Sequence, residues 1–306
     1  MVDGSMNSLL REHVLVALAR GEDDFETIVA DALELLEGEV DRDAVDAAAR
    51  AAFAAYREEQ RGWNGDLLDS ERLLAAFRDL DLDGVVARAD FTCCQSCGMN
   101  EIAGLAVPHA RGYVFCHRQD VDAAARGEGL FLSYGAFSPD GDPAEIGARV
   151  MDALRARGLT AEWDGAATSR IHLPLTWRRR RYAHLAASPD VPASDGPLQV
   201  TYCDYTRGRQ EDDPVPMSFE AFRGLLYELV PSNDNFVTCQ GRSGGVVQGM
   251  WDDGPRFWLE TPDTGARCSY GRWAGLDEAA RVVRALADED RVAITDLGDL
   301  ETVVWT

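Results

Sequence analysis

The spacing of the apolar residues changes near residue 91, and this change limits the folds open to the chain more than any other feature. Between residues 8 and 80, apolar side chains recur at intervals of three and four residues, a pattern typical of amphipathic helices. From Phe91 onward, short aromatic and β-branched runs alternate with helical stretches, and glycine and proline separate them. We therefore predict an α+β fold whose residues 1–90 form a helical N-terminal region.

Residues 91–184 are predicted to form a central α/β sandwich, because strand and helix patterns alternate along them. One helix start is well marked: Asp142 is a favourable N-cap, Pro143 suits the first helical position, and Glu145 can complete a capping box. The expected helices cover residues 120–126 and 142–158. The expected strands cover residues 112–116, 129–137, 159–163 and 170–175.

Residues 185–197 are predicted to be a linker, since they are small, polar, non-periodic and contain proline. Beyond them, residues 198–306 are expected to form a separate C-terminal α+β domain. Its predicted helices cover residues 218–229 and 277–287. Its predicted strands cover residues 198–205, 236–240, 245–251, 256–261, 292–295 and 302–305.

The charged residues exclude several kinds of chemistry. All 30 basic residues are arginines, so the chain has neither a Schiff-base lysine nor the lysine of a phosphate-binding P-loop. The 53 acidic residues give a formal net charge of −23, which disfavours nucleic acid as a partner. The one basic cluster, Arg178 to Arg181, is expected to be a solvated strand end that closes a domain.

The sequence offers no obvious route into or across a membrane. No apolar run approaches the roughly 18 residues that a transmembrane helix needs, and the first residues lack the basic start and apolar core of a signal peptide. We therefore expect a soluble, cytoplasmic protein that does not bind membranes.

The run F-T-C-C-Q-S-C-G contains three cysteines within five residues, and a Cys-His pair follows about twenty residues later. Thiolates and imidazoles with such spacings can bind zinc. The candidate ligands are Cys93, Cys94, Cys97, Cys116 and His117. Because adjacent residues of a strand point to opposite faces, neither adjacent pair can converge on one ion if it lies in regular strand. Zinc binding, thiol–disulfide or reactive-cysteine chemistry, and plainly buried thiols all remain open.

Several blocks between residues 62 and 182 resemble an uncharacterised bacterial family whose domain has no known function. The blocks are A-A-F-R-D-L-D-L-D-G-V-V-A-R-A-D-F-T-C-C-Q-S-C-G, R-G-Y-V-F-C-H-R-Q-D, G-L-F-L-S-Y-G, E-W-D-G and R-I-H-L-P-L-T-W-R-R-R. The resemblance implies that its signature positions are the cysteine cluster, His117, Gln119, Asp120, Trp163, Asp164, Gly165 and Arg170. Relatives often have an aromatic residue where this chain has Cys116, so a family-wide metal site would not depend on that thiol. Residues 198–306 are not recognised.

The C-terminal domain contains a predicted hairpin, with residues 245–251 and 255–260 joined by Asp-Asp-Gly. Strand alternation places Trp258 on the same face as Arg256 and Glu260. An exposed tryptophan there could anchor a partner, together with Arg256. Alternatively, Trp258 is half-buried beneath the helix at 277–287.

These features favour a cytoplasmic, non-enzymatic binding or regulatory protein, of the kind that includes immunity proteins and inhibitors, with a zinc site as a structural element. The expected partner is another protein. The alternatives are an enzyme that uses the Cys94, Cys97 and His117 region, and a thiol or metal sensor. The familiar signatures of metalloproteases, serine hydrolases and dinucleotide-binding enzymes are missing from the sequence.

Overall fold

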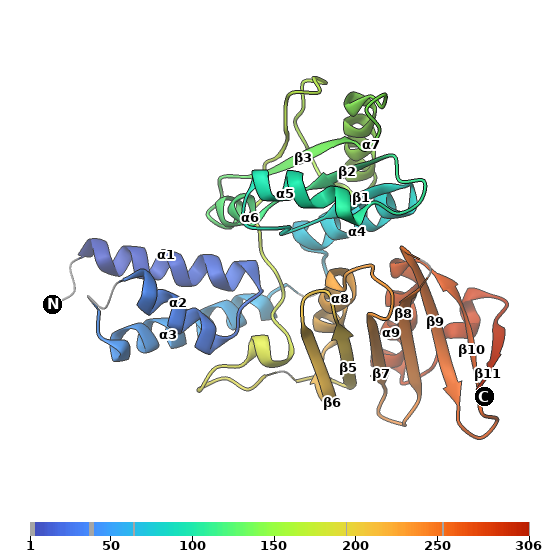
Figure 1. The fold of residues 1–306 in the computed structure, drawn as a ribbon. Helices are drawn as coiled ribbons and strands as arrows, with labels where there is room; N and C mark the ends of the chain where they lie inside the picture. The colour runs from blue at the N-terminus through green and yellow to red at the C-terminus, as the bar shows by residue number, and fades with distance from the viewer. Residues whose placement is uncertain (1–3, 37–39, 64, 194, 253, 306) are drawn as a thin grey trace. The chain divides into compact units, whose positions relative to one another are not determined.

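The computed structural model describes residues 4–36, 40–63, 65–193, 195–252 and 254–305 (Figure 1). The chain divides into two compact units. The first ends at Arg181 and also takes in Ser188–Val191; the second comprises Tyr182–Ala187 and the residues from Pro192 onward. Helices precede and flank a four-stranded sheet in the first unit, and a seven-stranded sheet dominates the second. The predicted α+β class is confirmed.

The first unit begins with three helices, as the apolar spacing predicts. They are α1 (Gly4–Arg20), α2 (Phe25–Leu35) and α3 (Arg42–Arg61). The Asp24 carboxylate caps α2 by accepting a hydrogen bond from the Thr27 N–H. Phe25 and Phe53 meet edge to face, with ring centroids 5.2 Å apart, so the apolar faces of α2 and α3 form one core.

A fourth helix leads into the first sheet, whose strand order is β1-β2-β3-β4. The elements are α4 (Asp69–Leu82), β1 (Val85–Arg88), β2 (Gly112–Phe115), β3 (Leu130–Ala136) and β4 (Ile171–Leu173). β1 pairs with β2 in parallel, and the other neighbours are antiparallel. β1 lies inside residues 1–90, which were predicted as a helical region: four residues are too few to establish a period, and pairing with β2 decides their conformation.

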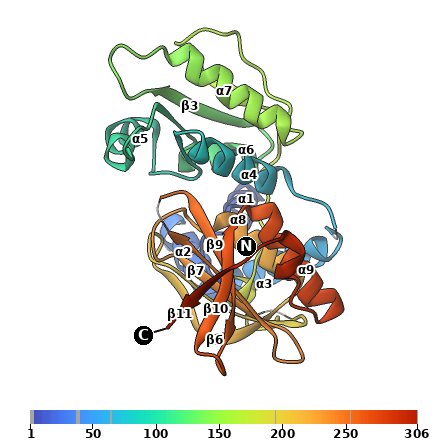
Figure 2. The same ribbon diagram turned by 90° about the vertical axis from the view of Figure 1, so that its right-hand side faces the viewer.

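Three further helices belong to this part of the first unit: α5 (Gln95–Glu101), α6 (Arg118–Ala125) and α7 (Pro143–Ala156). α7 runs along β3 (Figure 2) and begins at the predicted cap, where the Asp142 carboxylate accepts a hydrogen bond from the Ala144 N–H. α5 was not predicted. The strand predicted at residues 159–163 is reduced to a single bridge between Glu162 and His172.

The arginines at the end of the first unit are not a solvated strand end, so that prediction is wrong. Arg179, Arg180 and Arg181 are 1%, 3% and 1% exposed. Arg179 pairs with Glu22, and Arg180 pairs with Glu71 at 2.7 Å. The buried arginines therefore join the end of this unit to elements more than a hundred residues earlier.

The second unit is built on a seven-stranded antiparallel sheet with the order β11-β10-β9-β8-β7-β5-β6. Its strands are β5 (Leu198–Asp204), β6 (Arg209–Met217), β7 (Phe236–Gln240), β8 (Val246–Asp252), β9 (Arg256–Asp263), β10 (Cys268–Ala274) and β11 (Glu301–Val304). α8 (Phe219–Glu228) and α9 (Leu276–Glu289) pack against one face.

The structure confirms the hairpin of β8 and β9 and adds two strands that the sequence did not indicate. β6 contains Pro214 and Pro216, which are compatible with a strand because β6 is an edge of the sheet. β10 has little β-branched character and depends on pairing with β9 and β11. The strand predicted at residues 292–295 is wrong: this segment contains no strand, and its last two residues begin a short 3₁₀ turn, η3 (Ile294–Leu297).

Candidate metal centre

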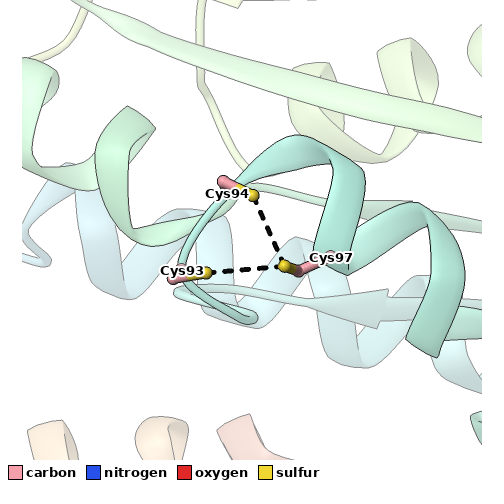
Figure 3. Close-up of side chains that lie close together, drawn as sticks. All are labelled: Cys93, Cys94 and Cys97. Carbon is pink, nitrogen blue, oxygen red and sulfur yellow. Dashed lines mark hydrogen bonds between the residues drawn. The ribbon is translucent and has the colours of Figure 1, made fainter.

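Three of the candidate ligands lie around the start of α5. Cys93 and Cys94 come immediately before this helix, and Cys97 lies in its first turn (Figure 3). Asp90 and Thr92 have positive φ angles of 52° and 60°, so the chain turns sharply just before the cysteines. Strand alternation therefore does not apply to Cys93 and Cys94, and both thiols can approach Cys97.

The three thiols form a compact group. The Sγ atom of Cys97 lies 3.5 Å from the Sγ atoms of both Cys93 and Cys94, and all three sulfurs are within 4.8 Å of one another. Sulfur ligands about 2.3 Å from a tetrahedral zinc ion are roughly 3.7 Å apart. The arrangement thus fits a thiophilic ion with little rearrangement. Cys93 is exposed and the other two are half-buried, so the group is accessible from solvent.

The local hydrogen bonds distinguish the thiols chemically. The backbone N–H of Cys97, followed by its thiol, lowers the pKa of Cys94 by stabilising the thiolate. Hydrogen bonds with the thiols of Cys94 and Cys93 raise the pKa of Cys97 to about 12. Cys94 is therefore the first of this pair to lose its proton.

The helix carrying Cys97 is held against β2 by close packing. A Cβ atom at Gly98 would lie 2.4 Å from Cε2 of Phe115, so only glycine permits this approach. Phe91 packs edge to face on the Phe115 ring at 5.9 Å, and the Tyr113 hydroxyl lies 3.5 Å from the Met99 sulfur. These contacts position the first turn of α5 beside Cys93 and Cys94.

Cys116 and His117 are not part of this group. Cys116 is fully buried in the apolar core, where desolvation raises its pKa to about 12. His117 caps α6: its Nδ1 accepts from the Asp120 N–H at 3.3 Å, and its Nε2 lies 3.0 Å from the Asp120 carboxylate. Burial lowers the pKa of His117, and Arg170 holds Asp120 through both carboxylate oxygens. The structure thus brings together three of the five candidate ligands.

The predicted binding residues of the second unit lie on β9, on the sheet face opposite α8 and α9. Trp258 is half-buried, and α9 does not cover it. The Arg256 guanidinium stacks over Trp273 at 3.9 Å from the ring centroid. The sequence placed Glu260 on this face but did not identify Trp273, whose neighbourhood depends on pairing between β9 and β10.

Comparisons with known proteins add one finding. Neither the curated proteins nor the solved structures gave a match. Within the described ranges, no helix is long and apolar enough to span a bilayer. A family model described as a domain of unknown function, DUF6891, matches residues 4–181. This range extends the resemblance seen in residues 62–182 to the N-terminal helices and leaves the second unit unassigned. The chain therefore belongs to the DUF6891 family.

Proposed function

We propose that the chain is a metal-responsive regulatory protein whose family domain binds zinc through Cys93, Cys94 and Cys97. The supporting observation is the convergence of the three Sγ atoms within 4.8 Å on an accessible turn. Thiolates are soft ligands that favour zinc over magnesium or calcium. The lowered pKa of Cys94 favours its thiolate form, and metal binding displaces the remaining thiol protons.

The site is better suited to reversible binding than to a purely structural role. Among the residues that the structure describes, no fourth side chain completes the group, and Cys93 is exposed. A structural zinc site is normally closed by four protein ligands, whereas three ligands leave a position for water or for a group from a partner. We therefore favour a regulatory site over the closed structural site considered from the sequence.

A thiol–disulfide switch is the second candidate, and the Cys94-Gln-Ser-Cys97 spacing supports it. The two sulfurs are 3.5 Å apart, and Cys94 combines a lowered pKa with access to solvent. Glutathione disulfide would oxidise the pair: the Cys94 thiolate attacks it and releases one glutathione thiolate, and Cys97 then displaces the second glutathione. The products are one intramolecular disulfide and two molecules of glutathione.

We also propose that the partner of this protein is another protein and that it acts in the cytoplasm. The net charge of −23 supports a protein partner over nucleic acid, and free thiols suit the reducing cytoplasm. A protein partner is also what an immunity-like or inhibitory function would require. The alternative is an enzyme that uses the open coordination position of the zinc ion. In that case, turnover should depend on both zinc and Cys94.

Elemental analysis of the full chain, purified without chelators under reducing conditions, tests the metal proposal. We expect about one zinc ion per chain, lost in Cys94→Ser/Cys97→Ser. The matched control is Cys116→Ala, which removes a nearby buried thiol and should retain the ion. Metal-free wild type that also fails to take up added zinc would overturn the metal proposal.

Mass spectrometry of the metal-free protein after exposure to glutathione disulfide tests the second candidate. A mass lower by about 2 Da, with Cys94 and Cys97 protected from alkylation, supports the switch. Protein that keeps both thiols free rules the switch out.

A further inference from the structure

The second unit contains a pocket that is independent of the cysteine site. It has a volume of about 550 Å³ and lies on the sheet face opposite α8 and α9. Its floor is a row of directly paired cross-strand neighbours from four adjacent strands. In strand order these are Phe236, Met250, Trp258 and Trp273. A volume of this size suits a small molecule.

Indole rings dominate the pocket. Trp258 and Trp273 meet edge to face, with centroids 5.2 Å apart and an angle of 77° between their planes. Gly271 allows this arrangement, because a Cβ atom there would lie 2.7 Å from Cζ2 of Trp258. Trp305, 37% exposed, is a third indole in the lining. The pocket therefore offers several aromatic rings, whose faces carry partial negative charge.

One carboxylate is built into this aromatic lining. Oε2 of Glu260 accepts hydrogen bonds from the Trp258 indole N–H and from the Ser269 hydroxyl, both at 2.7 Å. Oε1 accepts from the Gln248 amide at 2.5 Å. Ser269 is fully buried, so these contacts fix the carboxylate in place. The donors of Trp258, Ser269 and Gln248 are thus directed at Glu260 and not at the cavity.

This arrangement determines which ligand the pocket can recognise. The polar groups of Glu260, Trp258, Ser269 and Gln248 hydrogen-bond to one another, so a ligand such as a sugar would have to break these bonds to use them. The fixed negative charge of Glu260 and the indoles of Trp258 and Trp305 remain, and they attract a cation that needs no hydrogen-bond acceptor. We propose that this pocket binds a small quaternary ammonium compound, with its cationic head beside the Trp258 indole and near Glu260.

Arg256 defines which part of the pocket is open to such a ligand. Its guanidinium already stacks over Trp273 at 3.9 Å, and it lies opposite Asp252 in the β8–β9 pairing. This contact shows that the aromatic cluster accommodates a cation on one side. The ligand head therefore belongs beside Trp258 and Glu260, away from the guanidinium.

Isothermal titration of the full-length protein with choline and with 3,3-dimethylbutan-1-ol tests this assignment. The two probes have nearly the same shape, but only choline is charged. We expect saturable choline binding with a dissociation constant on the order of 1 mM or below. The neutral probe should bind about tenfold more weakly or not at all. Equal binding of both probes would show that the cavity recognises only apolar shape. No choline binding up to about 10 mM would reject the pocket as a ligand site. Either result overturns the proposal.

Two variants locate the binding. Glu260→Gln removes the charge with little change in shape, and we expect it to weaken choline binding about tenfold or more. Tyr270 is an exposed aromatic residue on β10, the strand that carries Trp273, and it is not part of the pocket. Tyr270→Leu should therefore bind choline as the wild type does. Unchanged affinity in Glu260→Gln would contradict the role of the carboxylate. If that variant fails to fold, the comparison of the two probes on the wild type still decides the proposal.

Discussion

Replacement of Arg180 by methionine should destabilise the first unit strongly, because it separates a buried ion pair. The side chains of Arg180 and Glu71 are 1% and 4% exposed. Nε of Arg180 donates to Glu71 at 2.7 Å, and Nη2 donates to the carbonyl oxygens of Trp63 at 3.0 Å and Asp66 at 2.8 Å. Arg180→Met removes all three hydrogen bonds while it preserves most of the volume.

The expected loss in the free energy of unfolding is about 3–5 kcal/mol, the range for removing one partner of a buried pair. The Glu71 carboxylate would keep a hydrogen bond from the Leu68 N–H but lose its buried cationic partner. Removing both charges in Arg180→Met/Glu71→Gln should cost less than the sum of the single changes, because neither charge is then left buried alone. Arg61→Met, which breaks an exposed pair with Glu58, is the control and should change stability by about 0.5 kcal/mol or less.

Hydrogen–deuterium exchange of the full chain can measure this effect in each unit separately. We expect amides of α4 to exchange about 10²- to 10⁴-fold faster in Arg180→Met, as a loss of about 3–5 kcal/mol implies. Amides of α9, in the second unit, serve as an internal reference and should be unchanged. If α4 exchanges no faster than in Arg61→Met, the buried pair does not stabilise the unit and the reasoning is refuted.

Three other experiments probe the first unit. Burial lowers the pKa of His13 below 6.5, so the unfolded chain binds a proton more readily than the folded chain does. The free energy of unfolding therefore falls as the pH drops below 6.5. Thermal melts of His13→Leu should lose this part of the pH dependence. Gly98→Ala forces a methyl group against Phe115 and should cost about 1–3 kcal/mol in urea denaturation and reduce zinc content, whereas wild-type behaviour would show that α5 moves freely. In timed alkylation of the metal-free protein, Cys94 should react well before Cys116, whose burial raises its pKa to about 12; the reverse order would contradict the assignment of the reactive thiol.

The sequence predicts features that depend on nearby residues and fails where distant residues decide. Asp142 caps its helix as expected, because capping needs only the next few backbone amides. Burial of Arg180 depends on Glu71, 109 residues earlier, and a run of arginines taken alone indicates solvent exposure. The grouping of the thiols depends on positive φ angles at Asp90 and Thr92, which residue type alone does not specify. The cysteines could thus be identified as candidates, but their convergence could not be predicted.

The two edges of the seven-stranded sheet have opposite consequences for self-association. β6 contains Pro214 and Pro216, which lack amide donors, and it also carries Glu211, Asp212 and Asp213. An approaching strand would meet repulsion and an incomplete hydrogen-bond ladder there. β11 contains no proline, and Val304 is 70% exposed. Fibril-like growth of this sheet would therefore start at β11, and a charged residue in place of Val304 should protect the protein from aggregation at high concentration.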